Sequence, residues 1–397
     1  MPILYSRASQ QLFRDLEKSE LKLGLRLAGV VATRMLGLFL VLPVLVLLAA
    51  DLPGYTPAMA GLALGVYGLT QATLQQPFGR LSDRWGRRQV ILLGLALFVA
   101  GSVVAALAEQ MWVLIAGRAL QGCGAIAGVA LAFAADHTHP DRRPVVMALI
   151  GMGIGAAFLV SIMVSVPLAS VFGLPGLFWV TAGLGLLGMV LVLGMPGGAP
   201  DVSDLRQPAG EQSPIAYLCA SVFLLHVLMT ALFVILPGQL LRTYGMPLPV
   251  HWQIYVPTMV ASVALVFPLL RMAARRSAEY ALMPWAFAVL SVPFALLSAG
   301  PSMWVLVVAM IAYFLAFNLL EATMPSLVSR KSGVSGRGRM MGRFTTFQFL
   351  GAFAGGSAGG IALQAVGPEA TLLSAALVCM AWAWVSRLVL KAEGVGQ

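Results

Sequence analysis

The chain has 397 residues, and its composition excludes a water-soluble protein. Residues of the AVILMFWYC class make up 59% and charged residues only 10%, against roughly 25% in soluble domains. The net charge of +10 does not indicate nucleic-acid binding, because the basic residues lie in short clusters between apolar runs. The three cysteines have spacings that fit neither a metal site nor a disulfide framework. We therefore expect a polytopic, all-α membrane protein without a cofactor.

Apolar runs of about 20 residues predict twelve membrane-spanning helices. These spans are expected at 27–50, 56–79, 89–108, 111–136, 144–170, 176–195, 214–240, 250–271, 278–299, 301–328, 339–366 and 369–390. One polar stretch, rich in proline, glycine and acidic residues, separates the first six spans from the last six. We expect an N-terminal lead-in and six-helix bundle over 1–195, a linker over 196–213 and a C-terminal six-helix bundle over 214–397. Such a layout is typical of duplicated transporter folds.

The basic residues also predict the orientation of the chain, because lysine and arginine are retained on the cytoplasmic side. With both termini inside, all but three of the 25 lysines and arginines fall in inside segments, the exceptions being Arg34, Arg118 and Arg242. The N-terminal residues lack the short apolar segment and cleavage site of a signal peptide. We therefore expect a multi-pass protein with both termini in the cytoplasm.

A charged motif follows the second expected span. It reads Gly79-Arg80-Leu81-Ser82-Asp83-Arg84-Trp85-Gly86-Arg87-Arg88 and resembles motif A of the major facilitator superfamily at every defining position. We expect Gly79 to permit close approach of the second and eleventh spans, and Gly86 to permit a tight turn. Asp83 suits the positive N-terminal end of a neighbouring helix. An ordinary basic loop is the alternative interpretation.

A second motif lies in the fourth span, where an arginine is costly and normally faces a cavity or a partner. It reads Leu114-x3-Arg118-x2-Gln121-Gly122-Cys123-Gly124-Ala125 and resembles motif B of the proton-driven antiporter branch. Arg118 has three open roles: bonding carbonyls of the first span, contacting substrate, or perturbing a proton-carrying carboxylate. The fifth span has Gly151, Gly155 and Pro167 but lacks the Gly-Pro pair of antiporter motif C.

Three further segments are similar to those of the YajR-like transporters within the drug/proton antiporter branch. They are Arg34-Met35-Leu36-Gly37-Leu38-Phe39 with Leu42-Pro43-Val44, Phe317-Asn318-Leu319-Leu320-Glu321-Ala322 with Pro325-Ser326-Leu327, and Phe347-Gln348-Phe349-Leu350-Gly351. Transporters of this kind can carry a small soluble C-terminal domain. This sequence ends at Gln397, seven residues after the last expected span, so we expect that domain to be lacking.

The resemblance implies the major facilitator fold, two pseudo-symmetric six-helix bundles in a bacterial inner membrane. It also implies a relay of motif A charges. In the outward-open state Asp83 meets the N-terminal end of the eleventh span, and Arg87 pairs with Asp136 at the end of the fourth. A solvated acid at a helix end is the alternative for Asp136.

Few ionisable residues remain within the spans. Glu321 is the only acidic residue deep in a span, and it is our leading candidate for carrying a proton or binding a cationic substrate. The alternative is a structural salt link or a polar group facing a cavity. Arg34 either binds an anionic group or balances Glu321, and it cannot carry the proton because arginine stays protonated. His226 is a second titratable candidate or a hydrogen-bonded core histidine. Polar and aromatic candidates for a central cavity are Tyr67, Gln71, Asn318 and Gln348.

The leading hypothesis is a proton-coupled exporter of drug-like compounds or metabolites that works by alternating access. A facilitator or proton symporter importing a small polar solute is the second, because motif C is incomplete and the first span lacks an acid. A non-transporting membrane scaffold is the third. The inside segments contain no nucleophile–base pair, metal cluster or phosphate loop, so we do not expect an enzyme. The expected partners are a small molecule, protons and the lipid bilayer around a monomer, without nucleic acid.

Overall fold

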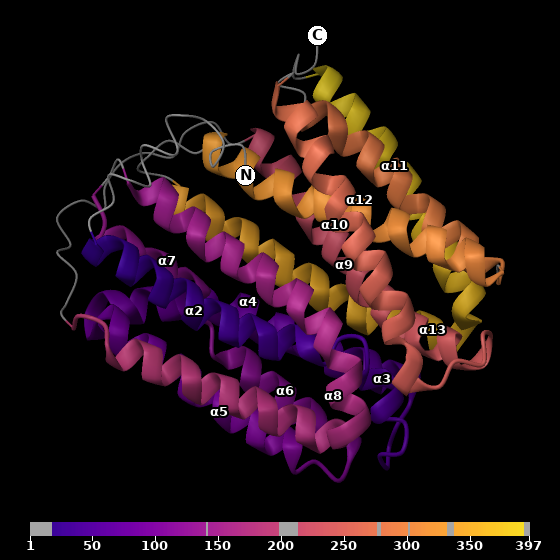
Figure 1. Cartoon of the computed structure of the whole chain (residues 1–397), viewed down its shortest axis with the longest axis horizontal. Helices are drawn as coiled ribbons and strands as arrows, with labels where there is room; N and C mark the ends of the chain where they lie inside the picture. The colour runs from indigo at the N-terminus through magenta and orange to yellow at the C-terminus, as the bar shows by residue number, and fades with distance from the viewer. Residues whose placement is uncertain are drawn as a thin grey trace.

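The computed structural model describes residues 18–139, 142–197, 213–275, 279–300, 302–331 and 337–392. Within these residues the chain folds into helices joined by short turns (Figure 1). The first half holds α2 (Lys18–Leu40), α3 (Leu45–Leu48), α4 (Pro57–Trp85), α5 (Arg87–Ala106), α6 (Met111–Cys123), α7 (Ala127–Asp136) and α8 (Arg143–Leu193). The second half holds α9 (Ser213–Arg242), the 3-10 helix η3 (Leu248–Val250), α10 (Trp252–Arg275), α11 (Glu279–Ser298), α12 (Met303–Lys331) and α13 (Arg337–Ala392). Most of the expected lead-in and of the expected linker lies outside the described residues.

Twelve membrane spans can be traced through the described residues, as predicted. Nine helical segments among them are long and apolar enough to cross a bilayer, and two of these, in α8 and α13, contain two spans each. The reversal inside α8 falls at Gly173 (φ 63°) and that inside α13 at Gly367 (φ 80°), a conformation that favours glycine. The remaining span is α4, which is less apolar because it carries buried Gln71 and Gln75.

Two expected spans are interrupted. The first begins at Lys18, earlier than predicted, and α2 stops at Leu40 because Pro43 has no N–H and disfavours a helical conformation in the residue before it. The fourth is broken between α6 and α7. At this break a Cβ on Gly124 would lie 2.3 Å from the Gly94 carbonyl oxygen, so the backbone of α5 passes very close.

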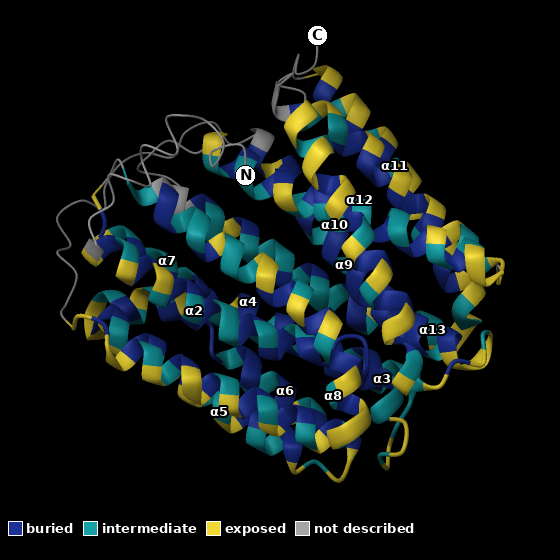
Figure 2. Cartoon of the chain, in the orientation of Figure 1, coloured by how far each residue is buried: buried dark blue, intermediate teal, exposed yellow. Residues whose placement is uncertain are grey.

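The helices form two groups, one from each half of the chain (Figure 1). In the first group α8 packs on α2 and α5, and α6 packs on α4 and α5. In the second, α13 packs on α9 and α11, and α12 packs on α10 and α11. Exposed residues lie on the periphery of both groups (Figure 2). They include large apolar side chains such as Val171, Trp304 and Leu377, and a broad exposed apolar surface suits contact with lipid.

Helices α4 and α13 join the two groups through glycines that bring their backbones together. A Cβ on Gly61 would lie 2.2 Å from the Gly356 carbonyl oxygen, and one on Gly68 would lie 2.3 Å from the Phe349 carbonyl oxygen. No side chain fits at such distances, so these positions depend on glycine. The closest contact between the two halves is therefore a contact of main chains.

A second glycine row of α13 packs on α9 in the same way. A Cβ on Gly351 would lie 2.1 Å from the Phe223 carbonyl oxygen, and one on Gly355 would lie 2.1 Å from that of Val227. These glycines of α13 therefore serve close helix packing.

The prediction for Gly79 is wrong, because a Cβ there would meet no atom within 4 Å. Gly79 lies near the end of α4, where the two helices are bridged by a side chain. Gln75 donates to the Gly342 carbonyl at 3.2 Å and to the Thr345 hydroxyl at 2.8 Å. A spacing that accommodates a glutamine side chain needs no glycine.

The first prediction concerns the backbone contact of α4 with α13. Gly68→Ala places a methyl group against the backbone of α13, and we expect the protein to lose about 1–3 kcal/mol of stability, as overpacked positions do. The matched control is Gly151→Ala on α8, where a Cβ meets no atom within 4 Å. We expect the control to unfold at the wild-type temperature or slightly above it. Thermal unfolding of the purified variants in detergent measures both, and equal unfolding temperatures would contradict the proposed packing.

Candidate functional site

The charged motif lies at the junction of α4 and α5. Gly86 joins the two helices with a φ of 94°, so the predicted tight turn is confirmed. Arg87, the first residue of α5, is buried and pairs with Asp83 and with Asp136, whose Oδ2 lies 2.9 Å from its Nε. It also donates to the Ser82 hydroxyl at 2.6 Å, a partner that the sequence did not single out. This cluster ties the ends of α4, α5 and α7 together.

The other arginines of the motif lie apart from this cluster. Arg88 donates to the Leu193 carbonyl at 2.9 Å, and Arg26 of α2 donates to the Gly194 carbonyl. Both therefore bind the carboxyl-terminal end of α8, where a cation is stabilised by the helix dipole. Arg84 is exposed near the end of α4.

A second polar cluster is buried among α2, α4, α5 and α6. Arg34 and Arg118 are 1% and 0% exposed, and their guanidinium carbons lie 5.5 and 5.1 Å from the centroid of the Tyr67 ring. Arg34 donates to Oε1 of Gln71 and also lies over the ring of Phe98. Cation–π contacts of this kind are worth about 0.5–2 kcal/mol each.

The hydrogen bonds around Arg118 link three helices. Arg118 donates to Oε1 of Gln121 at 2.7 Å and to the Ala63 carbonyl at 3.2 Å. Gln121 in turn donates to the Ser102 hydroxyl of α5 at 2.7 Å. The bonded carbonyl therefore belongs to the second span, so the alternative in which Arg118 bonds carbonyls of the first span is wrong. Gly122 brings α6 close to α4, because a Cβ there would lie 2.3 Å from the Tyr67 carbonyl oxygen.

The two arginines are not balanced by an acid. Their hydrogen bonds go to amide or carbonyl oxygens, and neither arginine forms an ion pair within the described residues. The prediction that Arg34 balances Glu321 is therefore wrong. The reason is that Arg34 packs on side chains of α4 and α5, whereas Glu321 accepts a hydrogen bond from Gln348 in the second half. A lone charge in a span costs at least ~2.5–3.5 kcal/mol, so two such charges destabilise the protein unless something compensates them.

A third polar cluster joins α9, α12 and α13. The Gln348 amide nitrogen lies 2.9 Å from Oε1 of Glu321 and 2.9 Å from Nε2 of His226. His226 Nδ1 lies 3.0 Å from the Val222 carbonyl oxygen, and a carbonyl requires a donor there. The imidazole therefore carries its proton on Nδ1 and accepts the Gln348 hydrogen bond at Nε2.

Glu321 keeps one oxygen free in this cluster. Its Oε2 is buried and has no hydrogen-bond partner among the described residues, and it lies 3.9 Å from Nε2 of His226. The structure thus brings together three residues that the sequence suggested separately. Asn318 is not among them, because its amide donates to the Ser262 hydroxyl of α10 at 3.2 Å.

Aromatic rings connect the two halves of the molecule. Phe39 of α2 packs on Phe158 of α8 at 5.1 Å between centroids, and Phe158 packs on Phe317 of α12 at 5.6 Å. Tyr67 of α4 and Phe349 of α13 form a second connection at 6.2 Å. Hydropathy alone does not reveal these contacts, because it does not give the rotation of each helix.

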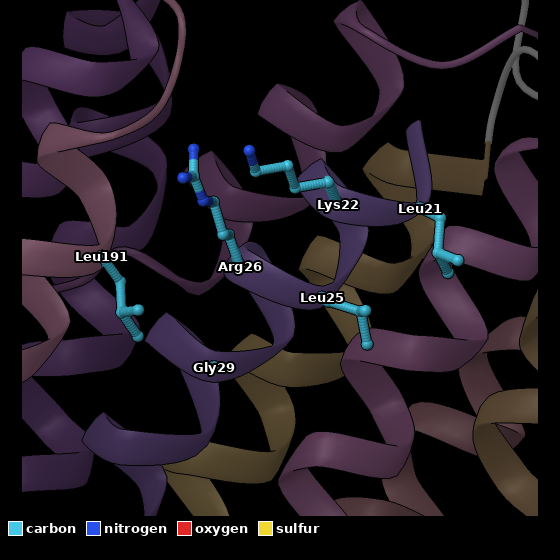
Figure 3. A pocket seen from close by; sticks show the side chains of 6 residues that line it. All are labelled: Leu21, Lys22, Leu25, Arg26, Gly29 and Leu191. Atoms are coloured by element: carbon cyan, nitrogen blue, oxygen red, sulfur yellow. The ribbon is translucent and has the colours of Figure 1, made fainter. Parts of the chain in front are cut away.

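A groove of about 400 Å³ lies on the outside of the first half, between α2 and α8 (Figure 3). Its lining is mainly apolar, with Lys22 and Arg26 at one side (Figure 3). Leu25 in this lining is 54% exposed. None of the residues of the two buried clusters lines this groove, so it is separate from them.

Comparison with known proteins identifies the family. Residues 27–253 match the Major Facilitator Superfamily. The chain belongs to the Major Facilitator Superfamily. It is 37% identical to the inner membrane transport protein YajR of Escherichia coli K12 over 372 residues, which covers 91% of this chain and 81% of that protein. It is 30% identical to an uncharacterized transporter, BU466, of Buchnera aphidicola from Acyrthosiphon pisum over 347 residues, covering 85% and 89%.

Solved structures agree on the fold of this major facilitator protein. The human organic anion transporter MFSD10 superposes with a TM-score of 0.71 at 18% identity, covering 93% of this chain and all of that one. A likeness at this identity concerns the fold alone. The chain is thus a multi-pass membrane transporter and not an enzyme.

The second prediction concerns the buried charge at the α4–α5 junction. Arg87→Gln leaves Asp83 and Asp136 without their shared cation, so we expect the purified variant to unfold at a lower temperature than wild type. Asp136→Asn removes one of the two ion pairs. In a double-mutant cycle we expect the two losses to be less than additive by about 1 kcal/mol. Additive losses would mean that the pair contributes nothing to stability.

Proposed function

We propose that the chain is a proton-coupled exporter of drug-like or metabolite small molecules, working by alternating access in a bacterial inner membrane. The similarity to an Escherichia coli protein named as an inner membrane transport protein supports the location. The distribution of lysine and arginine supports an orientation with both termini in the cytoplasm. The third polar cluster supports proton coupling, and it carries the proposal.

The cluster of Glu321, Gln348 and His226 has the chemistry of a proton site. A carboxylate and an imidazole lie 3.9 Å apart on different helices, and one amide donates to both. Oε2 of Glu321 and Nε2 of His226 are both able to accept a proton. A proton on Oε2 neutralises the only acid deep in a span within the described residues. A proton on Nε2 instead creates an ion pair and competes with the amide of Gln348.

Protonation is expected to act on α13 because Gln348 belongs to that helix. When Nε2 of His226 carries a proton, it no longer accepts a hydrogen bond from Gln348. The amide then has to turn or withdraw. Gln348 is adjacent to Phe349, whose carbonyl contacts α4 at Gly68. A local change of protonation thereby biases the contact between the two halves, as a ligand biases a two-state equilibrium.

The cluster of Arg87, Asp83 and Asp136 supports a gate at the carboxyl-terminal end of α4. In the structure Asp83 pairs with Arg87. We propose that Asp83 exchanges this partner for the amino-terminal end of α13 in the outward-open state, where the helix dipole stabilises a carboxylate. Arg87 remains paired with Asp136 in both states under this proposal.

The third prediction tests proton coupling. Glu321→Gln keeps the shape of the side chain but cannot bind and release a proton, so we expect pH-gradient-driven transport to fall at least tenfold. The measurement uses proteoliposomes with a trapped pH-sensitive dye, screened with cationic, neutral and anionic compounds. The gradient is imposed in both directions, because an exporter that exchanges substrate for protons and an importer that carries both together respond oppositely.

The matched control for this test is Glu369→Gln. Glu369 is exposed near the reversal inside α13, so the same chemical change there is expected to leave gradient-driven flux at the wild-type level. Full gradient dependence in Glu321→Gln would place the proton on another group, with His226, Asp51 or Asp136 next to be tested. Failure of Glu321→Gln to fold would assign Glu321 a structural role.

The fourth prediction tests the gate. Asp83→Asn removes the charge that favours the outward-open state, so that state becomes less populated by about fivefold for each kcal/mol lost. Ala58 lies where α4 and α13 meet, since its N–H donates to Gln364 at 3.3 Å. In a background without native cysteines, we expect Ala58→Cys to react more slowly with a membrane-impermeant thiol reagent when Asp83→Asn is present. An unchanged labelling rate would rule out the relay.

A further inference from the structure

The buried cluster around Tyr67 contains several hydrogen-bond donors without an acceptor. Nε and Nη1 of Arg34, Nη2 of Arg118 and Nε2 of Gln71 are all buried and have no hydrogen-bond partner among the described residues, and the same holds for the hydroxyl of Tyr67. The four nitrogen atoms belong to α2, α4 and α6 of the first half, and each of them can only donate. One hydroxyl cannot satisfy four donor atoms, so the cluster has more donors than acceptors.

Three other arginines of the described chain are balanced by acidic side chains. Arg87 pairs with two aspartates, Arg142 pairs with Glu20 at 2.6 Å, and Arg330 pairs with Glu279 at 2.9 Å. Arg34 and Arg118 are more deeply buried than any of these, yet they have only neutral partners. Buried charges are normally paired, and leaving them unpaired is costly. A purely structural role does not explain this arrangement.

We propose that Arg34, Arg118 and Gln71 bind an oxyanion group, a carboxylate or a phosphate, on the transported molecule. This inference rests on the proposed function, because it assumes that a substrate reaches the centre of the protein. An oxyanion supplies both of the missing elements, negative charge and hydrogen-bond acceptors. The planar guanidinium groups suit carboxylate and phosphate oxygens, to which arginine can donate two parallel hydrogen bonds. The substrate class is therefore an organic anion.

The position of the cluster suits a substrate site. Tyr67 contacts both guanidinium groups on one side and packs on Phe349 of the opposite half at 6.2 Å. A group bound beside Tyr67 therefore lies next to the boundary between the halves, as alternating access requires of a central site. Gln348, which precedes Phe349 in the chain, belongs to the third polar cluster.

The experiment measures binding in the absence of any gradient. The full chain is placed in nanodiscs of phosphatidylcholine, and thermal unfolding is followed while benzoate, phenyl phosphate, benzamide or benzylamine is added. We expect the two anions to raise the unfolding temperature with concentration, and the neutral amide and the cation to leave it unchanged. If neither anion stabilises the protein more than benzamide does, the proposal is overturned.

Variants test the named residues. Arg34→Gln and Arg118→Gln are expected to weaken anion binding at least tenfold, and Gln71→Leu, which changes no charge, several-fold. The matched control is Arg387→Gln, because Arg387 is an exposed arginine that lies over Trp285 of the second half. Anion binding that survives all three cluster substitutions would overturn the proposal. So would protection that appears only when phosphatidylglycerol is added, since the acceptor is then a lipid headgroup.

A further comparison distinguishes a ligand site from a structural one without any probe. Without an anion, Arg34→Met removes a buried charge that has no counter-charge, and we expect the unfolding temperature to rise. A structural arginine gives the opposite result. The binding experiment uses no gradient, so its outcome does not depend on proton coupling. If the anions do not bind but flux still depends on Glu321, only this inference is rejected. If the anions bind but transport is not coupled to protons, only the proposed function is rejected.

Discussion

The contact of α4 with α13 is the constraint on which the rest of the structure depends. Gly61 and Gly68 of α4 face carbonyl oxygens of α13 at distances that exclude a side chain. In a bilayer the hydrophobic effect does not drive helices together, so close van der Waals contact has to do so. This contact holds the two halves together.

The same contact separates two polar clusters of opposite character. Arg34 and Arg118 belong to the first half and carry positive charge, while Glu321 and His226 belong to the second half. Tyr67 and Phe349 lie between them and pack on each other. Because Phe349 also presents its carbonyl to Gly68, a movement of α13 alters the packing next to the arginines. The two clusters are therefore linked through packing and not through a shared ion pair.

Much of the fold can be predicted from sequence, because the length of an apolar run and the placement of basic residues follow directly from the bilayer. The pairing of Arg87 with Asp136 is in place as the family resemblance implies. What failed depends on tertiary geometry. Gly79 has the right residue type but lies where the helices are spaced by Gln75. Arg34 and Glu321 have complementary charges but belong to helices that turn them toward different neighbours.

The separation of the two clusters has a consequence for mechanism. If substrate and proton shared one carboxylate, each would exclude the other by direct competition. Under the two proposals made above, an anionic substrate beside Arg34 and a proton on Glu321 occupy different halves, so both can be bound at once. Coupling must then arise because each ligand favours a different arrangement of the halves, and its size is limited by the difference in their affinities for those arrangements. Under these proposals the glycine contact between α4 and α13 is next to both sites. Phe349, whose carbonyl faces Gly68, packs on Tyr67 and follows Gln348, which bonds to Glu321.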